Sequence, residues 1–271
     1  MADSSDDEPI TLSAHALDAL QDFYSGRDAR ARQFEELKAA AEERGAEGGE
    51  KEAALVYPLS MKTFGEDWNK SQFWYSDETA ALYARQLLEG ATSETRIAVV
   101  STPSVFVALK NILVSGSLPS PPSPPLAPVW AFLRASSPPG TPKPALTLLE
   151  HDYRFDVFSE FLFYDFMQPV KLPADLKGSV DRFIIDPPFL SDDCQTKMAL
   201  TIRWMAKPAA ADVRVMVVTS ERVEGLVTKL YRGFGIKTTD YEPAQGLSNQ
   251  FFTYANFDSE AWSWRPDLKD R

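Results

Sequence analysis

Cysteine, histidine and long apolar runs are scarce in this sequence. A single cysteine, Cys194, allows no disulfide within the chain, which is typical of a protein from a reducing compartment. The two histidines, His15 and His151, are too few to build a zinc site with it, so we expect no metal. No apolar run approaches the ~18 residues needed to cross a bilayer, so we expect no membrane partner.

Positive charge is also scarce. The 271 residues include 28 Lys and Arg against 39 Asp and Glu, for a net charge of −11. Such a chain has no general attraction for phosphate backbones, which disfavours nucleic acid and favours a basic protein as partner. The opening MADSSDDEPI has no Lys or Arg and so resembles neither a secretory signal nor a transit peptide. We therefore expect a cytoplasmic protein, and nothing in the sequence requires more than a monomer.

The chain divides into four parts by composition. We expect an acidic tail over 1–9, a helical extension and linker over 10–63, a main domain over 64–260 and a tail over 261–271. Within the main domain, residues 115–144 hold 10 of the 20 prolines, which favours an exposed inserted loop. A proline-rich ligand for a partner domain remains an alternative for this insert.

The main domain alternates strand and helix. The apolar pattern predicts helices over 77–90, 103–113, 191–206 and 221–234, and strands over 96–101, 145–150, 160–166, 180–186, 212–220, 235–243 and 249–258. The strands are almost continuously apolar. This pattern is typical of an α/β domain whose parallel or mixed sheet is covered on both faces.

The most informative motif is IIDPPF, residues 184–189, where an apolar strand runs into an acid, two prolines and an aromatic residue. In an open α/β sheet, ligands bind at the carboxyl ends of the strands, where Asp186 is expected. Pro187 and Pro188 lack N–H groups and stiffen the turn, and Phe189 adds an aromatic face. Together they predict an acceptor-rich pocket for an amine, with a plain rigid turn as the alternative.

The motif and its context resemble a known family. Asp186–Phe189 is similar to the [DN]PP[FYW] signature of methyltransferases that use S-adenosylmethionine to modify amino groups. SQFWYS (71–76), VVSTPSVF (99–106), LLEHDYRF (148–155), FLFYDF (161–166), DRFIIDPPFLS (181–191) and LSNQFFTYANFDS (247–259) follow one another as in one such family. That family was first described as N6-adenine methyltransferases and was later assigned as lysine methyltransferases of translation elongation factor 1-alpha.

The resemblance implies a seven-strand Rossmann-like fold, mostly parallel with an antiparallel last strand, and S-adenosylmethionine as cofactor. Two features depart from the usual pattern. No GxGxG follows the first strand, where the chain has Ser101-Thr102-Pro103-Ser104, similar to the S-x-P-S of the family. The insert over 115–144 replaces a connection that is short in the family.

By the same resemblance, residues after three successive strands contact the cofactor. We expect the start of the helix after Ser101 to favour the methionine carboxylate, and Glu150 or else Asp152 to accept from the ribose hydroxyls. Asp165 would accept from the adenine amino group, with Tyr164 or Phe166 against the ring. The full expected set is Ser101, Thr102, Pro103, Ser104, Glu150, Asp152, Tyr164, Asp165, Phe73 and Trp74, the last two as walls of the pocket or as a staple to the core.

Two substrates fit the motif itself. The exocyclic amine of adenine and the amine of lysine would both bind a carboxylate and a carbonyl. The charge of −11 and the resemblance favour protein lysine, with translation elongation factor 1-alpha as the partner. A methyltransferase-like binding module without activity is the third possibility.

Overall fold

The computed structural model describes residues 59–64, 74–115, 143–208, 212–243 and 251–266, together with helical residues scattered between 21 and 42. Within the expected helical extension over 10–63, the described residues 21, 25, 26, 28, 29, 32, 34–39 and 42 are helical. The predicted acidic tail and nearly all of the proline-rich insert, residues 116–142, lie outside the described residues.

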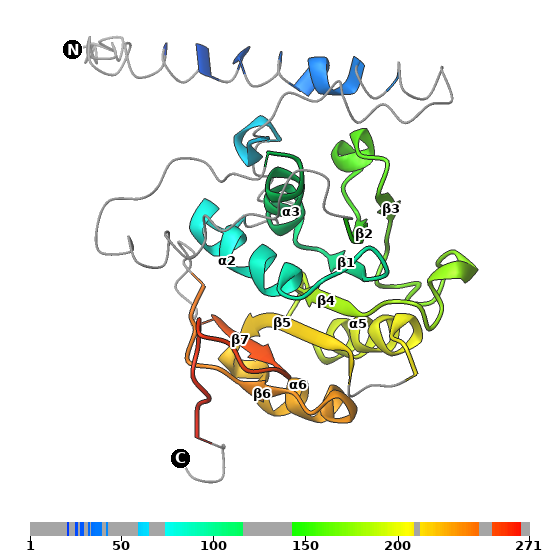
Figure 1. Cartoon of the computed structure of the whole chain (residues 1–271), viewed down its shortest axis with the longest axis vertical. Helices are drawn as coiled ribbons and strands as arrows, with labels where there is room; N and C mark the ends of the chain where they lie inside the picture. Colours follow the sequence, from blue (N-terminus) through cyan, green and yellow to red (C-terminus); the bar gives the residue numbers. More distant parts are fainter. Residues whose placement is uncertain are drawn as a thin grey trace, which may run out of the picture.

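A seven-stranded sheet forms the centre of the molecule (Figure 1), in the order β3-β2-β1-β4-β5-β7-β6. The first five strands of this order pair in parallel, and β7 lies antiparallel between β5 and β6. The strands are β1 Arg96–Val100, β2 Ala145–Glu150, β3 Phe161–Phe163, β4 Arg182–Ile185, β5 Arg214–Ser220, β6 Lys237–Thr238 and β7 Phe251–Ala255. The predicted fold class, including the antiparallel last strand, is confirmed.

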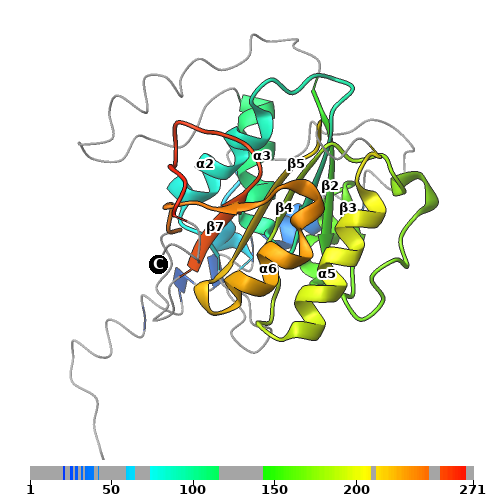
Figure 2. The ribbon, with the colours of Figure 1, turned by 90° about the horizontal axis from the view of Figure 1, so that it is seen from below.

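Helices cover both faces of the sheet, as Figure 2 shows. Helices α2 (Asp77–Leu88) and α3 (Pro103–Ser115) pack into one hydrophobic core, and α5 (Asp192–Met205) and α6 (Glu224–Leu230) into the other. Short 3-10 helices connect these elements: η2 Met61–Thr63, η4 Tyr153–Val157, η5 Ala174–Leu176, η7 Glu221–Val223 and η8 Arg232–Phe234. Because both faces are covered, the parallel strands bury side chains on both sides, which explains their continuous apolar sequence.

The helix starts follow the sequence signals. Ser76 accepts a hydrogen bond from the Thr79 N–H at the start of α2, and Ser191 accepts one from the Cys194 N–H at the start of α5. Pro103 occupies the first position of α3, where its missing N–H costs no hydrogen bond. These caps fix where each helix begins, at the same edge of the sheet as the carboxyl ends of the parallel strands.

Several predicted elements are shorter than expected. The helix predicted over 221–234 is α6 alone, flanked by η7 and η8, and Gly235 ends the segment with a φ of 74°. The strands predicted over 160–166 and 235–243 keep three and two residues. The side chains beyond β3 turn away to other partners, since the Asp165 carboxylate accepts from the Met167 N–H at 2.8 Å and closes a turn.

Among the described helices, none is long and apolar enough to cross a membrane.

Candidate functional site

Asp186 lies directly after β4, at the carboxyl edge of the sheet. Its N–H donates to the Val100 carbonyl at 3.1 Å, so the pairing of β4 with β1 continues to this residue. Its side chain accepts a hydrogen bond from the Tyr75 hydroxyl, with 2.5 Å between the oxygens. The carboxylate is therefore held in one orientation by a residue 111 positions away in the chain.

The environment of Asp186 favours its protonated form more than water does. Burial raises the pKa of this carboxyl to about 7, and the charge of Glu150 adds to the rise, while the hydrogen bond from Tyr75 opposes it. Burial and the Asp186 charge hold the pKa of Tyr75 well above 10.0, so Tyr75 stays a donor. A carboxylate with this pKa is a stronger proton acceptor than an ordinary aspartate.

The remainder of the IIDPPF motif forms the connection from β4 to α5. Pro187 is buried and Pro188 half-buried, whereas the Phe189 side chain is 47% exposed. The Phe189 ring meets Phe166 edge-on, with 5.8 Å between centroids. The motif thus combines a buried carboxyl group with an exposed aromatic ring three residues later, and its role as an amine pocket stays a prediction.

Gln195 forms a hydrogen bond to the connection between β4 and α5, and the sequence analysis did not identify it. It is wholly buried on α5, and its Nε2 donates to the Phe189 carbonyl at 3.0 Å and contacts the Thr219 hydroxyl at 3.4 Å. The amide therefore ties the motif to both α5 and β5. A glutamine one turn after the cap residue Ser191, on the apolar face of the helix, is the signal that would have indicated it.

Tyr75 is the second functional residue that was missed. The segment SQFWYS was expected to contribute Phe73 and Trp74, but Phe73 lies outside the described residues and Trp74 is half-buried, with the Arg154 guanidinium 6.0 Å from its ring centre. Tyr75 instead reaches Asp186, and its ring packs edge-on against Tyr83 at 5.5 Å. Neighbouring residues of an extended segment point to opposite sides, and this alternation was the available signal.

The turn from β1 to α3 replaces the missing glycine-rich loop. Ser101 has a φ of 55°, a left-handed conformation that costs energy for any residue except glycine, and its N–H donates to the Leu149 carbonyl at 2.9 Å. Thr102 is 2% exposed, and its hydroxyl has no hydrogen-bond partner in the described part of the chain. Pro103 and Ser104 then begin α3. A strained turn, an unsatisfied hydroxyl and a helix N-terminus fit an anionic group such as a carboxylate.

Glu150 and Asp152, which follow β2, have different surroundings. Glu150 is buried, and its Oε1 accepts from the N–H groups of His151 at 2.8 Å and Asp152 at 3.2 Å. Burial raises the pKa of Glu150 to about 7, against the effect of these two donors. Asp152 uses one oxygen to cap η4 and the other to bind Arg154, at 2.7 Å from its Nε. Glu150, with Oε2 bonded to no described residue, is the better placed of the two to accept from a diol.

Tyr164 and Asp165 follow β3 and belong mainly to the local structure. The Tyr164 hydroxyl lies 2.7 Å from that of Thr201, within the core beneath α5. Both Asp165 oxygens bond within its own turn, to the Met167 N–H and, at 3.4 Å, to the Gln168 amide. Their assignment to the adenine end of the cofactor stays a prediction.

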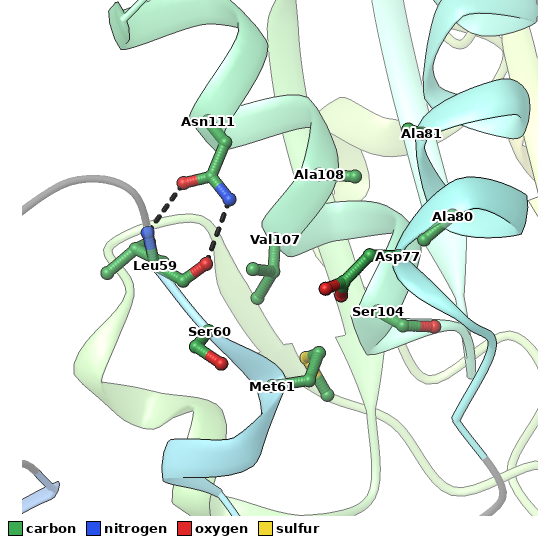
Figure 3. Close-up of a pocket in the computed structure, with 10 residues that line it drawn as sticks. All are labelled: Leu59, Ser60, Met61, Asp77, Ala80, Ala81, Ser104, Val107, Ala108 and Asn111. Atoms are coloured by element: carbon green, nitrogen blue, oxygen red, sulfur yellow. Dashed lines mark hydrogen bonds between the residues drawn. The ribbon is translucent and has the colours of Figure 1, made fainter. Parts of the chain in front are cut away.

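A separate cavity of about 120 Å³ lies beside this edge (Figure 3). Its walls come from α2, from α3 and from the segment that leads into η2. Its lining residues are Leu59, Ser60, Met61, Asp77, Ala80, Ala81, Ser104, Val107, Ala108 and Asn111. Of these, only Ser104 belongs to the expected cofactor set.

Cysteine and histidine take no evident part in the site. Cys194 is fully buried, and burial raises the pKa of its thiol to about 11, which removes the reactive thiolate at neutral pH. The His151 ring is exposed and packs 5.1 Å from Phe163. Within the described residues, no group of three or more His, Cys, Asp or Glu side chains is placed to hold a metal ion.

Comparison with known proteins gives consistent matches. A family profile described as "Probable N6-adenine methyltransferase" matches residues 66–259. "Protein-lysine N-methyltransferase EFM5" of Saccharomyces cerevisiae is 35% identical over 265 residues, covering 94% of this chain and 94% of that protein. "EEF1A lysine methyltransferase 1" of Gallus gallus is 31% identical, covering 95% and 98%, and the Homo sapiens protein of that name is 29% identical, covering 96% and 97%. Among solved structures, a SAM dependent methyltransferase from Aquifex aeolicus has a TM-score of 0.36 at 13% identity, covering 74% of this chain and 98% of that one.

Proposed function

Because the chain belongs to the "Probable N6-adenine methyltransferase" family, we propose that it transfers a methyl group from S-adenosylmethionine to a lysine of translation elongation factor 1-alpha. The names of the relatives support lysine as the acceptor and this factor as the substrate. We further propose that the protein acts as a monomer and that it meets its substrate in the cytoplasm.

The observation that carries the proposal is the Asp186 carboxylate, fixed by Tyr75 at the edge where β1, β2 and β4 end. A carboxylate beside two prolines and an exposed ring can accept the N–H bonds of an amine and contact its aliphatic stem. The buried Thr102 hydroxyl and the Glu150 carboxylate lie after neighbouring strands and fit the carboxylate and ribose groups of the cofactor.

The chemistry required of the protein is mainly alignment. A lysine has a reference pKa near 10.4, so its neutral form at pH 7 costs about 4–5 kcal/mol. S-adenosylmethionine supplies the methyl group when it is bound. Asp186, with a pKa of about 7, accepts an N–H of the lysine together with the Pro187 carbonyl, so the nitrogen lone pair is directed away from them. Phe189 packs on the lysine stem and keeps water from the nitrogen.

Methyl transfer from labelled S-adenosylmethionine tests the proposal. The purified chain is incubated with translation elongation factor 1-alpha from cells that lack this activity, and in parallel with DNA and RNA. We expect label in the protein, none in nucleic acid, and loss of the signal in Asp186→Ala. Asp192→Ala, which removes an exposed acid from the first turn of α5, is the matched control and should leave labelling unchanged. Label in nucleic acid but not in protein would support the adenine reaction instead.

A further inference from the structure

The cavity between α2 and α3 has chemistry that the methyl-transfer site does not explain. Six of its ten lining residues are apolar, namely Leu59, Met61, Ala80, Ala81, Val107 and Ala108. The volume of about 120 Å³ is well above the ~10–15 Å³ that a single water requires. A pocket of this size with mainly apolar walls can accept a hydrocarbon chain.

Among the described residues, Asp77 is the one charged residue that lines the cavity, and its side chain is exposed. Figure 3 shows its carboxylate directed toward Val107 and Met61. It forms no hydrogen bond or ion pair with any residue in the described ranges. Glu78 follows it in the same first turn of α2, but does not line the cavity.

Two of the other three polar lining residues, Asn111 and Ser60, are hydrogen-bonded, and the third, Ser104, carries no charge. The Asn111 side chain binds the Leu59 backbone twice, accepting from its N–H at 2.7 Å and donating to its carbonyl at 2.9 Å. The Ser60 hydroxyl accepts from the Lys62 N–H at 3.2 Å. Asp77 therefore decides which charge the cavity accepts, and it repels an anion such as the cofactor carboxylate.

An apolar pocket with one carboxylate at its wall matches a lysine or arginine side chain, whose methylenes pack on apolar surface while the charged head pairs with the acid. We propose that this cavity binds a basic residue of the protein substrate that lies near the target lysine in the same segment. This inference rests on the proposed function, since it takes the substrate to be a basic protein.

The position of the cavity supports a shared substrate segment. Asp77 follows Tyr75 by two residues, and two residues span at most about 7 Å. Tyr75 in turn bonds Asp186, which is the proposed partner of the target lysine. A substrate segment that places its lysine at Asp186 can therefore also reach Asp77.

The test compares Asp77→Asn with Glu78→Gln, two neutralisations in the same helical turn. For methylation of translation elongation factor 1-alpha, we expect Asp77→Asn to raise KM about two- to fivefold, the range of an exposed ion pair, with kcat unchanged. Glu78→Gln should leave KM unchanged. Ala108→Leu, which fills the cavity without altering charge, should raise KM as well, and its melting temperature shows whether the fold is intact.

Two results would overturn the cavity assignment. Equal KM values for Asp77→Asn and Glu78→Gln would remove the role of Asp77. A weaker Kd for S-adenosylmethionine in Asp77→Asn, measured by calorimetry, would assign the cavity to the cofactor. Failure of the proposed function is distinguishable, because wild-type protein would then methylate no lysine at all. In that case, the cavity is tested by the binding of a labelled peptide of alternating glycine and lysine, measured by fluorescence anisotropy. If Asp77→Asn weakens this binding no more than Glu78→Gln does, the cavity assignment is refuted.

Discussion

Tyr75 and Asp186 form the contact on which the site depends at the scale of single residues. The hydroxyl donates to the carboxylate at 2.5 Å and opposes the rise that burial causes in the pKa of Asp186. The acid must be ionised to accept from an amine. In the proposed mechanism, Tyr75 therefore acts through Asp186 as a positioning residue and sets the pH range in which the carboxylate is available.

Tyr75→Phe should move the acid limb of the pH profile of kcat/KM to higher pH. Loss of the donor leaves burial and the Glu150 charge unopposed, so the pKa of Asp186 rises, by about one pH unit for ~1.4 kcal/mol of lost interaction. The measurement is the dependence of kcat/KM on pH between about 5.5 and 9. Tyr83→Phe is the control, because its hydroxyl bonds Thr253 instead. An unchanged limb in Tyr75→Phe would contradict the assigned role.

Asp186→Asn should abolish transfer and stabilise the fold at alkaline pH. The folded pKa of Asp186 is raised to about 7 from 3.8, so the folded state holds a proton more tightly and stability falls as the pH rises from 3.8 to 7. Asparagine does not ionise, so Asp186→Asn does not undergo this fall in stability. Urea unfolding at pH 5 and pH 8, chosen as roughly the middle and the far side of that window, should show a gain that is larger at pH 8. Asp192→Asn, at an exposed position, is the control and should show no such gain in stability. An Asp186→Asn variant that is less stable than the wild type at pH 8 would contradict the account.

Elements with strong local signals were predicted well. Helices α2 and α5 begin at serine caps, and β1, β4 and β5 are apolar on both faces, so caps and pattern fix them without knowledge of the fold. The segment over 221–234 was misjudged because the helical pattern continues through Gly233, where the backbone becomes 3-10. β6 keeps two residues because its length depends on pairing with β7, which local sequence does not encode.

Gln195→Met tests the tie between α5 and the Asp186–Phe189 turn. The substitution keeps the volume but removes the donor to the Phe189 carbonyl, so the turn loosens. We expect kcat to fall about tenfold or more, since small displacements of aligned groups are costly, with the Kd for S-adenosylmethionine unchanged. Thr219→Val removes only the 3.4 Å contact of Gln195 and should have a much smaller effect. Equal losses in the two variants would show that the Phe189 bond is not the important one.

At the scale of the whole molecule, the sequence predicted which strand ends meet but not which side chains touch. Parallel strands place their carboxyl ends at one edge, so Ser101, Glu150 and Asp186 were expected together, and the strand order confirms that β2, β1 and β4 are neighbours. The bond from Tyr75 to Asp186 spans 111 residues, and no local pattern encodes it. The resemblance to the methyltransferase family is confirmed by the profile over residues 66–259.

The charge of −11 predicts a salt dependence for the whole enzyme. Long-range attraction to a basic substrate is screened when the Debye length shortens from ~10 Å at 0.1 M salt to ~3 Å at 1 M. We expect KM for translation elongation factor 1-alpha to rise by up to about tenfold over this range, with kcat unchanged. A short peptide of no net charge around the target lysine is the control. A KM for the intact factor that does not respond to salt would contradict electrostatic recruitment.

Mass spectrometry of translation elongation factor 1-alpha tests the central claim most directly. The factor is isolated from cells that contain the wild-type chain, the Asp186→Asn variant or neither, and its lysine-containing peptides are compared. The account predicts one lysine that carries methyl groups only with the wild-type chain. Identical methylation in all three samples would contradict it.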